Sequence, residues 1–338
     1  MQSPRASTEH IARLEAVLPV LLVAAVGTGW LMFAVGSAWG ALVLATHAAL
    51  GTVLLVGATV MLGAGRFERS AVSRVALGVA LITTSILGLA HAIVGVESIG
   101  GRAVLVTHVE LGMLSLVLMA WWVVRHRTRE SAVDSSRRAL LHPARLVGLA
   151  LLIRGGTEGM VRALSLPGSR RRRTGSYPRG SFDPSSMPTT MWLRDERPDI
   201  DVADWTLTVR GPTTSRSWTH EELAAFDDGL RATLDCTSGW FATQDWGGVL
   251  VDRLVPDREG GRSLVVRSAT GYQRRFPIDD VGHLMLATRA GGEPLRSGHG
   301  HPLRLVAPNR RGFWWVKWVV EIEIEDRPWW WQSPFPVG

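Results

Sequence analysis

The feature that constrains this chain most is a series of four long apolar stretches within its first 124 residues. They run approximately over residues 14–35, 38–63, 73–95 and 103–124. Each is long enough to approach or exceed the roughly 20 apolar residues that a helix needs to cross a bilayer. Because the intervening loops are short, residues 1–124 are predicted to form an all-α, four-helix transmembrane domain. The protein is accordingly expected in the cell membrane as a multi-pass protein in contact with lipid.

Arginine placement gives an expected orientation for these helices. Arginines precede the first stretch, lie between the second and third, and follow the fourth, whereas the other two loops contain only Arg102. Loops rich in Lys and Arg stay on the cytoplasmic side. Four crossings then predict that both termini, and the soluble domain that follows the helices, are cytoplasmic.

Each of the last three apolar stretches contains one histidine, His47, His91 or His108, and each histidine has a glycine four residues later. Ionisable residues inside a membrane are costly and often functional. One interpretation is a b-type haem, in which imidazoles are the axial iron ligands and a small residue one turn away makes room for the porphyrin. His47 with His108 is then the favoured pair, and His91 is a substitute. The other interpretation is close helix packing with hydrogen bonds between helices, and the sequence leaves both open.

Residues 125–175 are expected to link two domains. They contain twelve arginines and three acidic residues, including the run Arg170–Arg173. These charges argue against a fifth spanning helix over residues 139–166. They favour a basic amphipathic linker that lies on the inner membrane surface. No base-reading motif accompanies the basic run, so no nucleic acid is expected as a partner.

From residue 176 the pattern changes to short apolar runs broken by Gly, Pro and Asp. Strands are predicted over residues 205–211, 262–271, 301–308 and 316–326. A helix capped by Thr219 and Glu222 is predicted over 219–226, and a strand-to-helix turn over 246–255. Strands mixed with short helices, without a regular βαβ rhythm, predict an α+β domain over residues 176–338.

Four motifs of this domain occur in a particular order: LDCTSGW, QDWGGVLVDRL, SATGYQRRFPIDD and GHGHPLRLVAPNRRGFWWVKWVVEIE. In this order they resemble the sulfite-oxidase-type molybdopterin domain. That family includes sulfite oxidases and the catalytic subunits of bacterial periplasmic methionine sulfoxide reductases. The resemblance implies a sulfite-oxidase-like fold, a molybdenum cofactor (Mo-molybdopterin) and a molybdopterin-dependent oxidoreductase with two-electron oxo-transfer chemistry.

The resemblance also assigns roles to two residues that are singular in this chain. Cys236 is the only cysteine, and in the family a cysteine thiolate ligates molybdenum, as expected for a soft donor. Lys317 is the only lysine among 37 basic residues, and it stands where the family's lysine contacts the pterin. Because Lys and Arg are not interchangeable, its retention favours a need for a point charge.

Further cofactor contacts are expected from Arg304, His299 and His301, which could meet the cofactor phosphate or an anionic substrate. Cys236 and Arg304 are the predicted catalytic residues. Ser186 lies in the segment that resembles the opening of the family's cofactor site, although serines replace an asparagine-containing turn there. His299, His301 and Arg304 are each also compatible with a plain surface role.

Two departures from the family concern the substrate. Where sulfite oxidases hold the sulfite dianion with arginines, this chain has Phe241 and Trp314. Sulfite is therefore an unlikely substrate, and a neutral or aromatic small molecule is favoured. The runner-up interpretation is a non-catalytic membrane protein that uses a molybdopterin-type domain for interactions.

The predicted topology conflicts with a direct electron path. All three histidines fall in the outer half of the membrane, while the soluble domain is predicted inside. A haem would exchange electrons with a quinone or a redox partner. Electron transfer through a quinone, absence of the haem and a different topology all remain open.

Overall fold

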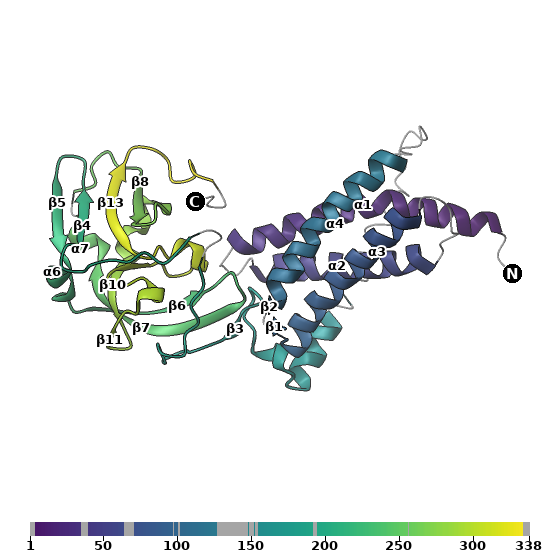
Figure 1. The fold of residues 1–338 in the computed structure, drawn as a ribbon, viewed down its shortest axis with the longest axis horizontal. Coiled ribbons are helices and arrows are strands. Elements are labelled where there is room, and N and C mark those ends of the chain that lie inside the picture. The colour runs from purple at the N-terminus through teal and green to yellow at the C-terminus, as the bar shows by residue number, and fades with distance from the viewer. Residues whose placement is uncertain are drawn as a thin grey trace. The chain divides into compact units, whose positions relative to one another are not determined.

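The protein was analysed as a computed structural model, which describes residues 4–34, 40–63, 71–96, 98–100, 102–126, 148, 152, 155–191, 195–255 and 257–333. In the first helix, side chains are described for residues 17–32. The chain forms two compact units, of which the first ends at Gly175 and the second begins at Ser176 (Figure 1). This is the position at which the sequence pattern changes.

The first unit is helical. Its long helices are α1 (Pro4–Ala34), α2 (Gly40–Gly63), α3 (Ala71–Leu89) and α4 (Val104–His126). A π-helical turn, η1 (Ala90–Val94), extends α3, and a short hairpin of β1 (Ser98–Ile99) and β2 (Arg102–Ala103) leads into α4. Leu18 and Leu22 of α1 pack in one apolar core with Met61, Leu77 and Met119 from the other three helices.

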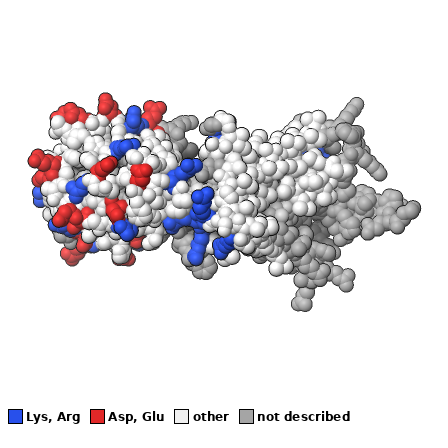
Figure 2. Space-filling model, turned by 90° about the horizontal axis from the view of Figure 1, so that it is seen from below, with Lys and Arg blue, Asp and Glu red and all other residues white. Residues whose placement is uncertain are grey.

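Three stretches of the described helices are long and apolar enough to cross a membrane, namely Gly40–Gly63, Val72–Val94 and Val104–Val124. The described apolar part of α1, Val17–Met32, is shorter. On the face shown in Figure 2, the described helical surface carries few charged side chains, whereas acidic and basic side chains alternate over the second unit. These helices therefore suggest membrane association, but the expected count of four spans stays a prediction.

The segment before the second unit returns to the end of α3. Residues 155–163 are helical, and the 3₁₀-helix η2 (Pro167–Arg170) follows. A Cβ on Gly168 would lie 2.3 Å from the carbonyl oxygen of Ala92 and 2.8 Å from that of Ile93, so η2 packs directly on η1. The α4 helix has 23 residues, and at about 1.5 Å per residue its ends lie about 35 Å apart. The chain leaves α4 at His126, at the end remote from η1, and lies against η1 by Gly168.

Residues 127–147, which hold part of the predicted linker over 125–175 and part of the disfavoured span over 139–166, are outside the described residues. Of the arginine run, Arg170, Arg172 and Arg173 are exposed. Arg171 instead pairs with Glu158 at 2.5 Å, and its side chain is only 4% exposed. At least one member of the basic run is therefore part of the internal structure of the first unit.

The second unit contains two sheets. The first sheet has the order β11-β10-β7-β3, with β12 paired to β10 and β6 paired to β7. Its strands are β3 (Tyr177–Pro178), β6 (Asp228–Asp235), β7 (Trp240–Leu250), β10 (Met285–Ala290), β11 (Glu293–Pro294) and β12 (Arg304–Val306). The β6–β7 hairpin is continuous from Asp228↔Gly248 to Asp235↔Phe241, which fixes the turn that contains the cysteine.

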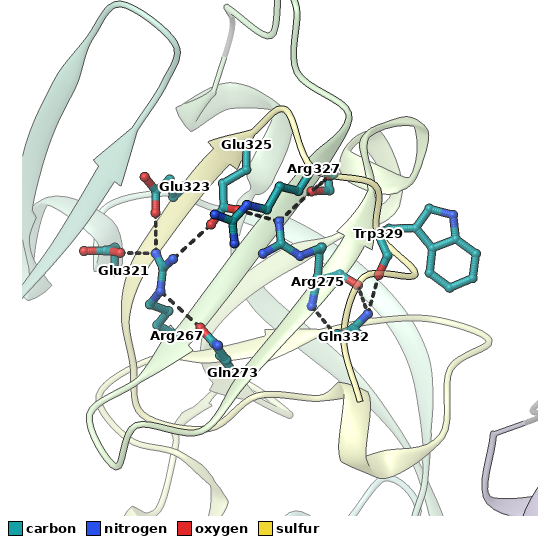
Figure 3. Close-up of polar contacts among 10 residues, drawn as sticks. Arg267, Gln273, Arg275, Glu321, Glu323, Glu325, Arg327, Trp329 and Gln332 are labelled. Carbon is teal, nitrogen blue, oxygen red and sulfur yellow. Dashed lines mark hydrogen bonds and ion pairs between the residues drawn. The ribbon is translucent and has the colours of Figure 1, made fainter. Parts of the chain in front are cut away.

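The second sheet has the order β5-β4-β13-β8-β9. Its strands are β4 (Thr206–Arg210), β5 (Ser215–Thr219), β8 (Ser263–Ser268), β9 (Gln273–Pro277) and β13 (Val319–Glu325). Side chains alternate between the faces of a strand, so Ile322 and Ile324 of β13 are buried while the glutamates lie on the other face. There Arg267 bridges Glu321, Glu323 and Glu325, and Arg275 donates to Glu325 at 2.6 Å (Figure 3).

The predicted α+β class is confirmed for this unit. Each predicted strand overlaps an observed one, and the helix α6 (His220–Ala224) begins with the expected capping box between Thr219 and Glu222. The predicted strand-to-helix turn is the passage from β7 into α7 (Val251–Leu254). The short helices and the two sheets together position the residues described next.

Candidate active site

Cys236 lies in the turn between β6 and β7. Its backbone N–H donates to the Trp240 carbonyl at 2.8 Å, and its own carbonyl accepts from Gly239 at 3.2 Å. Gly239 has φ of 97°, a conformation that favours glycine. The Cys236 residue is 8% exposed, and its sulfur is 3.1 Å from the Ser238 hydroxyl oxygen. The tight turn thus holds the sulfur in a buried position beside the Ser238 hydroxyl.

A buried ion pair packs against the backbone of this turn. Asp235 accepts from Arg311 at 2.6 Å and from the Ser176 hydroxyl at 2.6 Å. Arg311 also donates to the Cys236 carbonyl at 3.2 Å. The exposed fractions of Asp235 and Arg311 are only 5% and 3%. Removing either charge would leave the other buried without its counter-ion, so this pair fixes the backbone of the cysteine turn.

Two cations approach the turn from the C-terminal motifs. Arg304 begins β12, is 1% exposed, and donates to the His299 carbonyl at 2.9 Å. Its guanidinium also lies 5.1 Å from the ring centroid of Trp246. Lys317 donates to the carbonyls of Gly298 at 2.6 Å and Thr190 at 2.9 Å. Among the described residues, neither cation forms an ion pair with an acidic side chain, so the cluster is suited to an anionic ligand.

The glycine between the two histidines of the GHGH motif makes this approach possible. Gly300 has φ of 106°, which L side chains rarely adopt. A Cβ there would lie 2.9 Å from the Cβ of Arg304 and 3.2 Å from the Cα of Lys317. Glycine is therefore needed both for the turn and for the close packing of the two cationic residues.

Burial and mutual repulsion set the charge state of the cluster. Burial lowers the pKa of Arg304 to about 10, and the nearby Cys236 opposes this shift. Burial lowers the pKa of Lys317 to about 8, with a further contribution from the Arg304 charge. Burial, followed by the charges of Arg304 and Lys317, lowers the pKa of His299 to about 4. At neutral pH, His299 is neutral while the two cations keep their charge.

The other predicted contact residues lie elsewhere. Ser186 is exposed, and its hydroxyl donates to Asp183 at 2.5 Å; together with Ser185 it lowers the pKa of that carboxyl group to about 2. The His301 ring lies 5.5 Å from the ring of His220, and burial lowers the pKa of both histidines. The structure therefore brings together Cys236, His299, Arg304 and Lys317, and turns the side chains of Ser186 and His301 to other partners.

The structure adds Thr190, which the sequence gave no reason to single out. Its carbonyl accepts from Lys317, its hydroxyl accepts from the Trp240 indole N–H at 3.0 Å, and the same hydroxyl is 3.1 Å from the Ser238 hydroxyl. Thr190 follows Ser186 by four residues in the segment PSSMPTTM. The segment that resembles the opening of the family's cofactor site therefore contributes Thr190 to these contacts.

The aromatic residues around the site are mostly structural. Trp314, Trp315 and Trp318 are 6%, 2% and 0% exposed. Trp314 lies against two guanidinium groups, those of Arg274 at 4.3 Å and Arg310 at 5.0 Å from its ring centroid. This burial places the three tryptophans in the core of the domain.

The helical unit contains a second pair of polar side chains. The rings of His47 and His108 are 5.9 Å apart between centroids and nearly perpendicular at 83°. The Nδ1 of His47 is 2.8 Å from the Ala25 carbonyl oxygen, and the Nδ1 of His108 is 2.8 Å from that of Thr84. A carbonyl only accepts, so Nδ1 carries the proton in each ring and Nε2 keeps its lone pair.

His91 is placed differently from this pair. Its Nδ1 and Nε2 lie 3.2 Å from the carbonyl oxygens of Val96 and Gly175. The glycines that contact the facing rings are Gly29 and Gly88, whose Cβ atoms would lie 3.1 and 3.0 Å from Cε1 of His47 and His108. They are not the residues four positions after each histidine, so the predicted His–Gly spacing does not describe the contact.

The sequence of the second unit is similar to that of known oxidoreductases. Residues 195–332 match the family described as the oxidoreductase molybdopterin binding domain. An uncharacterized oxidoreductase of Bacillus subtilis, YuiH, is 27% identical over 39% of this chain and 72% of its own length. The methionine-sulfoxide reductase catalytic subunit MsrP of Xanthomonas campestris is 31% identical over 28% of this chain and 35% of its own length. The sulfane dehydrogenase SoxCD of Paracoccus pantotrophus is matched in structure at a TM-score of 0.37 and 28% identity, over 39% of this chain and 40% of that one.

The second unit is therefore a molybdopterin-binding oxidoreductase domain, and the protein is a molybdopterin-dependent oxidoreductase. The residues present fit the molybdenum cofactor. Arg304 is almost fully buried with an Nε that has no hydrogen-bond acceptor among the described residues, and within the same residues Lys317 forms no ion pair, although the charge of Asp195 acts on it. An anionic group with several acceptor oxygens would satisfy both cations, and Cys236 supplies the soft donor that molybdenum requires.

Proposed function

We propose that this protein is a membrane-anchored molybdenum enzyme that carries out two-electron oxo-transfer on a small molecule. The observation that carries the proposal is the meeting of the thiol with buried Arg304 and partly buried Lys317, neither of which forms an ion pair with an acidic side chain among the described residues. In the absence of an anion, such an arrangement is unfavourable, because each buried charge loses its hydration. A bound anionic cofactor would offset this cost, because its oxygens accept charge-assisted hydrogen bonds from the two cations.

The roles of the residues follow from their positions. Cys236 ligates the metal, held in place by the Asp235–Arg311 pair behind the turn. Arg304 and Lys317 hold the anionic part of the cofactor, and neutral His299 offers its imidazole as a hydrogen-bonding group. When bound, the molybdenum cofactor supplies the oxo-transfer chemistry, while the protein supplies binding and electrostatics.

The proposal excludes sulfite as a good substrate. Phe241 is partly buried on β7 and cannot hold an anion. Trp314 is buried, although Arg274 and Arg310 lie over its ring. Neither Phe241 nor Trp314 can form the bidentate contact that an arginine makes with an anion. The guanidinium groups of Arg274 and Arg310 lie against the Trp314 ring and do not take the place of an arginine at position 314. Sulfite turnover with an artificial acceptor near the ordinary enzyme value of about 10 per second would reject this exclusion.

A haem in the helical unit would connect this chemistry to the membrane. The His47 and His108 rings come from two different helices, lie 5.9 Å apart between centroids, and each uses Nδ1 for a backbone carbonyl. His47 and His108 would hold the iron of one b-type haem, and a quinone or redox partner would carry the electrons. The alternative of packing alone predicts folded protein without haem bands.

The contacts of η2 support a location of the oxidoreductase domain on the histidine side of the membrane. Arginine counting over four spans predicted the cytoplasmic side. However, Gly168 and Gly175 contact the end of α3, whereas α4 ends at the opposite end of the unit. If the arginine-rich loops are cytoplasmic, the second unit continues from the outer face, which removes the conflict between haem and domain. A reporter that is active only outside the cell, fused after Gly338, should be active, and an inactive but folded fusion would contradict this location.

The central test compares the purified protein with Cys236→Ser. Wild-type protein should contain about one molybdenum per chain, and X-ray absorption at molybdenum should count one sulfur neighbour fewer in the variant. Activity should fall by more than the roughly 10- to 100-fold that changes in outer-shell residues cost. Thr237→Ser, a neighbouring substitution in the same turn, is the control. An unchanged sulfur count together with retained activity in Cys236→Ser would overturn the assignment.

A further inference from the structure

We propose that a directional hydrogen-bond chain, Trp240–Thr190–Ser238, ends on the Cys236 sulfur and tunes the reduction potential of the metal that this sulfur binds. The inference rests on the proposed function and adds two tuning residues to it, Thr190 and Ser238. Three contacts make the chain, which are 3.0 Å from the Trp240 Nε1 to the Thr190 Oγ1, 3.1 Å from there to the Ser238 Oγ, and 3.1 Å from Ser238 to the Cys236 sulfur.

The direction of the chain is set at its two ends. An indole N–H can only donate, so the Thr190 hydroxyl oxygen accepts from Trp240. A metal-bound cysteine is a thiolate, which has no proton and can only accept. The Ser238 proton must then point to the sulfur, and the Ser238 oxygen is left to accept from Thr190. Each hydroxyl in the chain therefore donates once and accepts once, in a single direction.

Such a chain strengthens its last hydrogen bond. Hydrogen bonds in series polarise one another, and the effect is greater where water is scarce. Trp240 is 7% exposed and Cys236 is 8% exposed, while Thr190 and Ser238 are partly buried. The hydroxyl that donates to the sulfur is thus a better donor than an isolated serine.

Donation to a metal-bound sulfur withdraws electron density from the metal. Hydrogen bonds to sulfur are among the factors that set the potentials of sulfur-ligated metal centres. The more electron-rich reduced state gains more from the donor, so the hydrogen bond raises the reduction potential. Thr190 also connects this effect to the cation cluster, because its carbonyl accepts from Lys317 at 2.9 Å.

The test is a potentiometric titration of the full-length holoenzyme in detergent. The electron paramagnetic resonance signal of molybdenum monitors the titration. Ser238→Ala should lower the midpoint potential. At a fixed potential, the ratio of oxidised to reduced metal should then rise by about threefold to tenfold. A tenfold change corresponds to about 59 mV for a one-electron couple. Thr190→Val should shift the potential in the same direction by less, and Thr190→Ser, which keeps the hydroxyl, should behave as wild type.

The matched control is Thr237→Val, because Thr237 lies between Cys236 and Ser238 and makes none of the three hydrogen bonds. A second measurement needs no variant that could fail to fold. In wild-type protein, electron–nuclear double resonance should show one exchangeable proton coupled to molybdenum that disappears in D₂O, and Ser238→Ala should lack it.

The outcomes separate this inference from the proposed function. Molybdenum bound through Cys236, with the same potential and the same exchangeable coupling in Ser238→Ala as in wild type, overturns the chain alone. Folded wild-type protein without molybdenum overturns the proposed function and the chain with it. A lowered potential in Ser238→Ala and Thr190→Val, with Thr190→Ser and Thr237→Val unchanged, supports the chain.

Discussion

The two units both bury polar side chains, but they do so in opposite ways. In the helical unit, His47 and His108 are surrounded by apolar helices, and each ring has one close backbone carbonyl. In the sheet unit, Cys236 lies in a network of ion pairs and hydrogen bonds contributed by five separate segments. Each histidine of the helical unit therefore has few hydrogen-bond partners. In the sheet unit, by contrast, each polar side chain shares its partners with others, so that a change at one side chain affects the rest. This contrast can be tested in each unit separately.

The largest expected effect is loss of haem from the helical unit. His47→Ala or His108→Ala should abolish the haem bands in reduced-minus-oxidised spectra, because each removes an axial ligand. His91→Gln should keep them, since both His91 nitrogens face backbone carbonyls. Haem retained in both alanine variants, or lost only in His91→Gln, would show that the ligand assignment is wrong.

In the sheet unit, Arg304→Met should weaken cofactor binding while leaving the fold intact. Truncating one partner of a buried charged hydrogen bond costs about 2–5 kcal/mol, which is more than about 25-fold in affinity. The cofactor-free protein should unfold no more easily than wild type, because the variant removes a buried charge that has no acidic partner. Molybdenum per chain and thermal unfolding are the two measurements.

Arg289→Met is the matched control for that prediction. Arg289 is partly buried but donates to the carbonyls of Ala224 and Phe226 at 2.9 and 2.8 Å, away from the cysteine turn. It should lower stability without changing the molybdenum content. Equal molybdenum loss in both variants would mean that Arg304 contributes to the fold rather than to cofactor binding.

The cooperative nature of the sheet unit predicts a contrast between two aspartates of the same hairpin. Asp235 is paired with Arg311 in the core, whereas Asp245 pairs with Arg231 at side-chain exposures of 54% and 66%. Asp235→Asn should lower the free energy of unfolding by about 3–5 kcal/mol, and Asp245→Asn should lower it far less, because solvent screens the exposed pair. Denaturant unfolding followed by tryptophan fluorescence measures both. Similar losses in the two variants would refute a supporting role for the buried pair.

The smallest effect is a pH dependence contributed by His299. Its pKa is lowered to about 4 in the folded protein, from an ordinary value of 6.5. Between these values the unfolded chain binds the proton and the folded protein does not, so stability falls as the pH is lowered from about 6.5 to about 4. His299→Gln should reduce this slope in cofactor-free protein, while His283→Gln, at an exposed position, should not. Equal slopes in wild type and His299→Gln would contradict the buried, neutral state of His299.

The extent to which the sequence could predict these features differs between the units. Apolar length predicted the helices, and the rarity of histidine in such helices pointed to His47 and His108. Period-two alternation predicted β13, and a capping pattern predicted α6. Cys236 and Lys317 were found because each is the only residue of its kind.

Other features depend on contacts between distant segments and left no local signal. Thr190 reaches Ser238 and Lys317 across 48 and 127 positions, so nothing near Thr190 in the sequence marks it. The same holds for Ser176, which reaches Asp235 across 59 positions. Ser186 was chosen because its segment resembles a turn at the family's cofactor site. In this structure the Ser186 hydroxyl donates to Asp183 instead.

The position of β13 has a consequence for how the enzyme is made. This strand is the last along the part of the chain that the structure describes, yet it lies in the middle of its sheet, between β4 and β8. Arg304 and Lys317 also come 68 and 81 residues after Cys236 in the sequence. During synthesis from the N-terminus, the ribosome must therefore deliver the chain through β13 before this sheet can close and both cations can meet the cysteine turn. A chain that stops before β13 is therefore expected to bind no molybdenum cofactor.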